Sequence, residues 1–181
     1  MRYDKIYFKN LCYSDNLLMG LFSNNKKLIE INNINTDEID ALIFVSQTAD
    51  YKLPQTSHIL QSKLHLKEDT ICFDFPIGCN GYIYGLFQAS VLINSKACKK
   101  VLLLTGDTTS KVINNKDRSL KMVFGDGGSA TLIEVGTDVL SFIIYSDGSQ
   151  YNDLIILDLA ENISLFGVFD GHGGQEVSKF V

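Results

Sequence analysis

No segment of this 181-residue chain is apolar over the roughly 20 residues that a membrane-spanning helix needs, so a transmembrane protein is not expected. The first residues, MRYDKIYFKN, lack the apolar stretch of a secretory signal peptide. Lysine and arginine form no cluster or stripe, and the formal net charge is -5, so a nucleic-acid-binding role has little support. These absences favour a globular protein of the cytoplasm.

The cysteines, Cys12, Cys72, Cys79 and Cys98, show none of the paired spacings that are typical of zinc or redox sites. Free thiols in a reducing cytoplasm are therefore the simplest interpretation. Because a free cysteine is more often a small buried residue than a nucleophile, each position needs its own argument. Cys72 lies inside an expected strand and is assigned to the core, whereas Cys12 and Cys98 are assigned no role.

Strand-like and helix-like segments alternate up to residue 107, after which strand-like segments follow one another. Continuous apolar runs of strand length are typical of strands that are buried on both faces, as in a parallel sheet. Strands are expected over residues 41–47, 70–77, 99–107, 129–135, 139–148 and 153–159. Helices are expected over residues 14–31, after Pro54, and over residues 81–95, where small residues share one face. This order predicts an α/β fold with a mixed, mostly parallel sheet and antiparallel strands at one edge.

The most informative segment is FDFPIGCNGYIYGL, residues 73–86, in which a strand leads directly into Gly78-Cys79-Asn80-Gly81 and then a helix. Unpaired backbone N–H groups and the positive end of the helix dipole favour a thiolate at such a turn. The flanking glycines permit a tight turn and a close approach of substrate, and nearby N–H groups could bind an oxyanion. Cys79 is therefore the candidate nucleophile. The alternative is a structural residue in a strand-to-helix turn.

In four separate segments, the chain resembles the 3-oxoacyl-acyl-carrier-protein synthase III family of the thiolase superfamily. The segments are DEIDALIFVSQTADYKLP (37–54), DFPIGCNGYIYGL (74–86), KKVLLLTGDTTSK (99–111) and DRSLKMVFGDGGSATLIE (117–134). They occur in the family's order and spacing. The resemblance implies a thiolase-like layered fold, of which residues 1–160 would form the amino-terminal half.

The resemblance implies an acyltransferase of fatty acid biosynthesis, in which Cys79 takes an acyl group from a thioester of coenzyme A or acyl carrier protein. No bound cofactor is implied. Condensing members of the family then let a decarboxylating malonyl thioester attack the acyl-enzyme. Gly78, Asn80 and Gly81 would support the nucleophile, as would the turn formed by Gly125, Asp126 and Gly127. For that second turn we favour a plain glycine-rich connection, and we interpret Asp107 and Asp126 as hydrogen-bonding residues and not as acids.

Several parts of the family pattern are absent. The family's catalytic histidine and asparagine, and one oxyanion-hole N–H, come from its second half. His58 and His65 do not replace them, because both are expected on the surface of a helix. The family's first strand, central in its sheet, is missing or poorly replaced by KIYF, residues 5–8. Full condensing activity by this chain alone is therefore not expected. A homodimer or a complementary second half is expected as partner, and a non-catalytic half that binds a partner or acyl-CoA is the alternative.

The carboxyl-terminal residues 165–181, LFGVFDGHGGQEVSKFV, resemble the metal-binding strand and turn of metal-dependent protein serine/threonine phosphatases. In that comparison, Asp170 and the carbonyl of Gly171 would hold Mg²⁺ or Mn²⁺, and His172 would protonate the leaving group. One such turn cannot form a two-metal site. Residues 161–181 are therefore set apart as a carboxyl-terminal segment, either a phosphatase fragment or a divergent form of a strand that the synthase family carries here.

Overall fold

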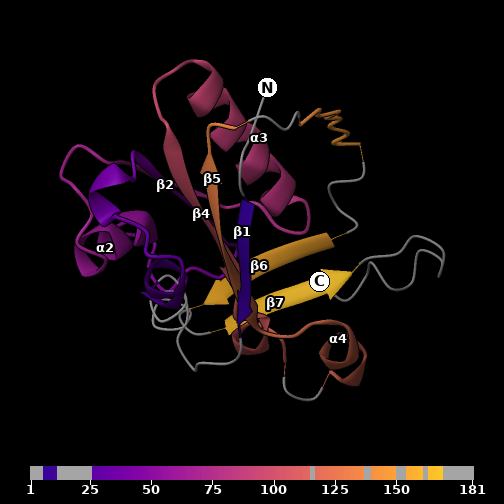
Figure 1. The fold of residues 1–181 in the computed structure, drawn as a ribbon. Helices are drawn as coiled ribbons and strands as arrows, with labels where there is room; N and C mark the ends of the chain where they lie inside the picture. Colours follow the sequence, from indigo (N-terminus) through magenta and orange to yellow (C-terminus); the bar gives the residue numbers. More distant parts are fainter. Residues whose placement is uncertain are drawn as a thin grey trace. The chain divides into compact units, whose positions relative to one another are not determined.

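The computed structural model describes residues 6–11, 26–114, 117–136, 140–149, 154–160 and 163–168 (Figure 1). The chain divides into two compact units. Unit 1 comprises Met1–Thr108 and Asp126–Phe142, and unit 2 comprises Thr109–Gly125 and Ile143–Val181. Within the described residues, the structure contains no helix that is long and apolar enough to cross a membrane.

Unit 1 is built on a five-stranded sheet with the strand order β1-β5-β4-β2-β3. The strands are β1 (Ile6–Leu11), β2 (Ala41–Val45), β3 (Ile71–Phe75), β4 (Lys100–Asp107) and β5 (Gly127–Glu134). β2 runs parallel to both β3 and β4, whereas β5 is antiparallel to its neighbours β4 and β1. The predicted mixed sheet, with antiparallel pairing at one edge, is confirmed.

The prediction that the first strand is missing or poorly replaced is wrong. β1 pairs with β5 along its whole length, from Ile6 opposite Ile133 to Leu11 opposite Gly128. It lies at the edge of the sheet and not at its centre. An edge strand needs only the main-chain groups of one neighbour, so the weak apolar pattern of KIYF did not reveal it.

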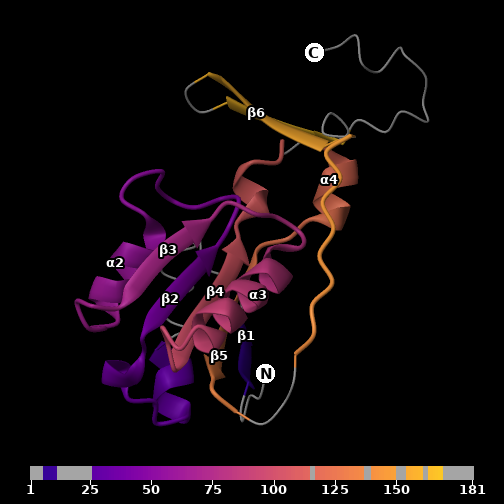
Figure 2. The same cartoon turned by 90° about the horizontal axis from the view of Figure 1, so that it is seen from above.

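Helices cover both faces of the sheet, as Figure 2 shows. On one face, α3 (Gly81–Asn94) packs over a core that includes Ile43, Val101 and Leu103. On the other face, α2 (Thr56–Lys63) and the helical residues 26–31 cover a second core. Alternate residues of β2 and β4 supply the two cores because successive side chains of a strand point to opposite faces. All five residues of β2 are buried, as the apolar run predicts. β3 is an edge strand, so its residues are only partly buried and the expected burial on both faces is wrong there.

α3 lies close to the sheet because its inner face carries small residues. A Cβ atom added at Gly81 would stand 2.5 Å from Cγ1 of Val45, and one at Gly85 would stand 2.5 Å from Cδ1 of Leu103. Ala89, one turn further along the helix, is fully buried. The small face that the sequence predicts is therefore confirmed, and its role is to let the helix approach β2 and β4.

The remaining predicted elements have mixed outcomes. α2 begins at Thr56, two residues after Pro54, and a short 3₁₀ helix, η1 (Thr36–Glu38), forms in the acidic turn before β2. Of the expected helix over residues 14–31, residues 26–31 are helical, and the other residues lie outside the described part. The strand expected over residues 139–148 is wrong, since residues 140–148 pair with no strand that the structure describes. An apolar run becomes a strand only where a neighbour accepts its backbone hydrogen bonds.

Unit 2 contains a 3₁₀ turn, a short helix and a hairpin. These are η2 (Thr109–Lys111), α4 (Arg118–Val123), β6 (Leu154–Ala160) and β7 (Ile163–Val168). β6 and β7 pair antiparallel, with a register irregularity between Asp158 and Ala160. The division expected after residue 160 falls between these two strands and stays a prediction.

A larger side chain at Gly85 tests the close packing of α3. We expect Gly85→Val to lower the free energy of unfolding by about 1–3 kcal/mol, because the added atoms overpack the contact with Leu103. Urea denaturation followed by circular dichroism measures this change. Gly148→Val is the matched control, since nothing lies within 4 Å of a Cβ at Gly148. Equal stability of the two variants would contradict the packing argument.

Candidate active site

Cys79 lies in the turn that joins β3 to α3. The turn is closed by a hydrogen bond from the Gly81 N–H to the carbonyl oxygen of Gly78, at 2.7 Å. Asn80 is the N-cap residue, and its carbonyl oxygen accepts from the N–H groups of Ile83 and Tyr84. Cys79 is exposed and forms no disulfide. The structure therefore presents a free thiol at the amino end of a 14-residue helix, where the sequence predicts it. Its chemical role stays a prediction.

The loops that follow the parallel strands meet at the end of the sheet where this turn lies. β2, β3 and β4 run in the same direction, so their carboxyl ends lie together at one end of the sheet. Ser46, just after β2, donates its backbone N–H to the carbonyl oxygen of Phe75 at the end of β3, at 3.1 Å. Binding sites of open α/β sheets form outside the carboxyl ends of the strands, so this end of the sheet is the candidate site.

Asp107, at the end of β4, holds the loop that follows β2. Its Oδ1 atom accepts hydrogen bonds from Ser46 Oγ at 3.0 Å and from the backbone N–H of Gln47 at 2.8 Å. The same oxygen accepts from Thr48 N at 3.0 Å and from Thr48 Oγ1 at 2.9 Å. Thr48 Oγ1 in turn accepts from the N–H of Thr108 at 2.7 Å. Asp107 is thus confirmed as a hydrogen-bonding residue, and it fixes the chain between β2 and α2.

Gln47 is a site residue that the sequence analysis missed. A Cβ atom at Gly78 would stand 2.5 Å from Cδ, Nε2 and Oε1 of Gln47, so the side-chain amide lies directly against Gly78. A larger side chain at position 78 would therefore displace the Gln47 amide from this place. The only sequence signal was indirect, namely a polar residue that follows a buried strand within one of the matched segments.

A second carboxylate, that of Asp74 in β3, caps the amino terminus of α2. Its two oxygens accept from the backbone N–H groups of Thr56 at 2.7 Å and Ser57 at 2.9 Å. The N-cap residue Gln55 makes no side-chain capping bond, so Asp74 takes its place. Burial, with a smaller effect of the Asp74 charge, raises the pKa of the neighbouring Cys72 thiol to about 11. The sequence analysis assigned Cys72 to the core, but the residue is only half-buried. At neutral pH its thiol stays protonated.

The turn around Gly125, Asp126 and Gly127 leads into β5. The register of the sheet places Gly127 opposite Asp107, at the same end of the sheet as the Cys79 turn. Thr109 Oγ1 donates to the carbonyl oxygen of Gly125 at 2.8 Å. A Cβ at Gly125 or Gly127 would meet nothing within 4 Å, so neither glycine is required for space. These observations agree with a glycine-rich connection between sheet elements.

The histidines of the described residues do not enter the site. His58 and His65 are both exposed, as expected, and lie on or just after α2. Asp170, Gly171 and His172, the residues of the metal-binding alternative, lie outside the described residues. Among the residues that the structure describes, no group of three or more histidine, cysteine, aspartate or glutamate side chains could hold a metal ion.

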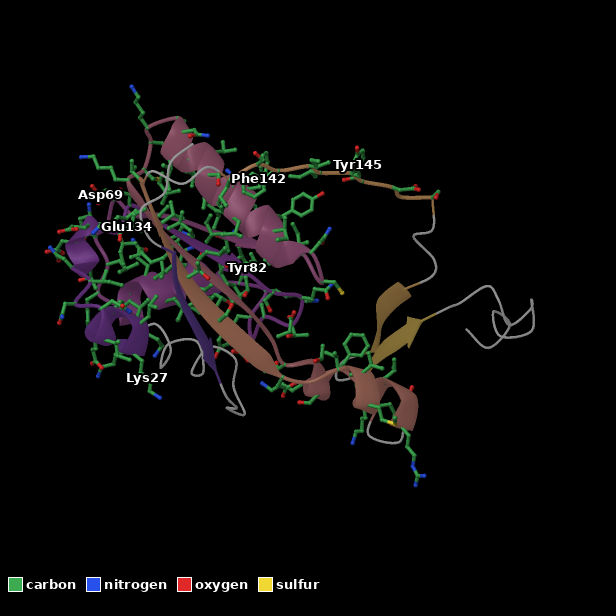
Figure 3. The ribbon with its side chains drawn as sticks, turned by 45° about the vertical axis from the view of Figure 1, so that its right-hand side comes forward. Lys27, Asp69, Tyr82, Glu134, Phe142 and Tyr145 are labelled. Carbon is green, nitrogen blue, oxygen red and sulfur yellow. The ribbon has the colours of Figure 1, made fainter. Side chains whose placement is uncertain are left out.

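The outer face of α3 is apolar and exposed. Ile83, Phe87 and Val91 succeed one another at four-residue intervals, with exposed fractions of 48%, 36% and 41%. The ring of Phe142 packs against Phe87 with centroids 5.6 Å apart, and Figure 3 shows it beside the helix. On the inner side, Tyr82 projects toward the sheet, where its hydroxyl lies 3.3 Å from Thr131 Oγ1 (Figure 3). α3 contains no charged residue, and it carries apolar side chains both toward the sheet and away from it.

Comparisons with known proteins agree on one family. Residues 73–148, which include the Cys79 turn, match the model of 3-oxoacyl-[acyl-carrier-protein] synthase III. The chain is 39% identical over 173 residues to a candidate 3-oxoacyl-[acyl-carrier-protein] synthase 3 of Campylobacter jejuni, covering 95% of this chain and 48% of that protein. It is 35% identical over 132 residues to the beta-ketoacyl-[acyl-carrier-protein] synthase III of Coxiella burnetii, covering 72% and 41%.

A solved structure shows the same fold. The 3-oxoacyl-(acyl-carrier-protein) synthase of Burkholderia xenovorans superposes with a TM-score of 0.75 at 34% identity, over 93% of this chain and 47% of that one. The chain therefore spans about half the length of the relatives it matches.

The thiols of this chain differ in exposure, and alkylation tests that difference. We expect iodoacetamide at pH 8.5 to modify Cys79 at least about tenfold faster than Cys72 or Cys98. Cys79 is exposed, whereas burial raises the pKa of the other two thiols and lowers their thiolate fraction. Peptide mass spectrometry resolves the sites, and in urea all three should react at similar rates. Equal labelling of Cys72 and Cys79 in the folded protein would show that the Cys79 thiol is no more accessible than that of Cys72.

Proposed function

This chain belongs to the 3-oxoacyl-[acyl-carrier-protein] synthase III family of thiolase-fold acyltransferases, and we propose that Cys79 accepts an acyl group from a thioester of coenzyme A or acyl carrier protein. The observation that carries this proposal is the exposed free thiol of Cys79 at the amino end of α3, inside the segment that matches the family. No bound cofactor is part of the proposal. The free thiols of Cys72, Cys79 and Cys98 fit the reducing cytoplasm that we propose as its compartment.

The proposed reaction is an exchange of thioesters. Cys79 first releases its thiol proton to solvent, and the thiolate sulfur attacks the carbonyl carbon of the acyl thioester. A new C–S bond to Cys79 forms, the C–S bond to coenzyme A breaks, and the released coenzyme A thiolate takes up a proton. The positive end of the α3 dipole favours both the thiolate and the oxyanion of the intermediate. The short turn of Gly78, Asn80 and Gly81 keeps the thiol accessible to this attack.

A second chain is part of the proposal. The chain spans 48% of the length of the Campylobacter jejuni relative, and we propose that it associates with a second copy or with a complementary half. Support for a partner comes from the exposed stripe of Ile83, Phe87 and Val91, which begins four residues after Cys79. A contiguous exposed apolar stripe of this kind is typical of a surface that another protein covers. A half that binds a partner or acyl-CoA without turnover is the alternative function.

Acylation of the isolated chain tests the proposed reaction. We expect intact mass spectrometry to detect one acyl group after incubation with acetyl-CoA or longer acyl-CoA, and we expect Cys79→Ala to abolish it. Cys72→Ala is the matched control and should acylate like the natural chain, because the Cys72 thiol is half-buried and protonated. An adduct that persists in Cys79→Ala would rule out Cys79 as acceptor. Absence of an adduct on the folded chain would favour the non-catalytic alternative.

Association through α3 can be measured independently. In sedimentation velocity, we expect the natural chain to dimerise and Phe87→Asp to weaken the dimer at least about tenfold, because a charge would be buried in the apolar contact. Ile31→Asp serves as control, since Ile31 is 64% exposed and belongs to the helical residues that cover the opposite face of the sheet. A natural chain that stays monomeric would contradict the homodimer and leave a complementary chain as the proposed partner.

A further inference from the structure

The side chain of Gln47 lies against the peptide that carries the candidate nucleophile. A Cβ at Gly78 would be equally distant, at 2.5 Å, from the carbon, nitrogen and oxygen of the Gln47 amide group. The amide of Gln47 therefore lies where a side chain at position 78 would stand. Gly78 is followed directly by Cys79, so this amide is a neighbour of the thiol-bearing residue.

Two anchors hold Gln47 in this position. Its own N–H donates to Asp107 Oδ1, and the residues on either side, Ser46 and Thr48, donate to the same oxygen. The backbone N–H of Ser46 also reaches the carbonyl oxygen of Phe75, four residues before Cys79. The loop with Gln47 and the turn with Cys79 are therefore tied to each other at the end of the sheet. Hydrogen bonds to a charged acceptor are stronger than neutral ones, so the loop is held firmly.

The chemistry of the amide suits the place where it lies. A glutamine amide carries two N–H donors and one acceptor oxygen and has no charge at any working pH. Gln47 is exposed, so its amide can contact a bound substrate in addition to contacting Gly78. In thioester exchange, negative charge develops on the carbonyl oxygen next to the attacking sulfur, and a neutral preorganised donor stabilises such charge.

We propose that Gln47, whose backbone is anchored through Asp107, is a positioning residue for Cys79, and that its side-chain amide orients the Gly78–Cys79 peptide and stands beside the thiol. The inference rests on acyl transfer at Cys79 for its purpose. Its geometry, however, can be tested by the reactivity of the thiol alone.

Substitution by glutamate tests the location of the amide. Gln47→Glu keeps the shape of the side chain and adds a negative charge, which disfavours a nearby thiolate. We expect the midpoint of the pH profile for Cys79 alkylation by iodoacetamide to rise by roughly half a pH unit. Gln55→Glu makes the same change at an exposed glutamine at the start of α2, which packs on the opposite face of the sheet, and should leave the midpoint unchanged. Identical midpoints for the natural chain and Gln47→Glu would overturn the proposal.

Removal of the donors tests the purpose of the amide. Gln47→Met keeps the length of the side chain without its N–H groups, and we expect it to slow acylation of Cys79 by acetyl-CoA about tenfold. The limiting alkylation rate at high pH and the thermal midpoint should stay those of the natural chain, as should all values for Gln55→Met. An unchanged acylation rate in Gln47→Met would refute the positioning role. If the natural chain is not acylated at all, the proposed function fails, and the alkylation profile of Gln47→Glu still decides the inference on Gln47.

Discussion

The close contact between α3 and the two central strands is the constraint on which the candidate site depends. Gly81 lies against Val45 of β2, and Gly85 lies against Leu103 of β4, at distances that leave no room for a Cβ atom. Because the helix is held this close, its amino terminus stands at the carboxyl ends of the parallel strands. The turn with Cys79 is thereby placed at the end of the sheet where open α/β sheets bind their ligands. The glycines thus serve the location of the thiol as much as the packing of the core.

Carboxylates complete this arrangement as anchors and not as acids. Asp107 joins the loop after β2 to the end of β4, and Asp74 closes the amino terminus of α2 from the neighbouring strand. At the other end of the sheet, Asp40 Oδ2 accepts the backbone N–H groups of Lys99 and Lys100. Each carboxylate replaces water with fixed backbone donors, which orders loops that carry no regular structure of their own. Preorganisation near the site therefore comes from main-chain hydrogen bonds to Asp107 and Asp74, while Asp40 orders the opposite end of the sheet.

The outer face of α3 links the candidate nucleophile to the proposed association with a partner. The helix that places Cys79 is uncharged, and it exposes Ile83, Phe87 and Val91 on the side away from the sheet. The relatives are about twice as long as this chain. The exposed stripe and the proposed need for a partner therefore meet at one helix, directly beside the candidate nucleophile. A partner that covers this stripe would also exclude water from the neighbourhood of the thiol, which strengthens the electrostatic effects there.

The sequence by itself determined the elements whose signal is local. Apolar runs marked β2 and β4, the spacing of small residues marked the inner face of α3, and the GCNG turn marked the exposed Cys79. Tertiary structure alone decided that Ile6–Leu11 forms an edge strand and that residues 140–148 pair with no strand described in the structure. It also decided that Gln47 touches Gly78, and that Asp74 caps a helix that begins 18 residues before it. Each of these features depends on whether groups far apart in the chain meet. No local periodicity encodes such a meeting, because it is decided only once the sheet has brought the strands together.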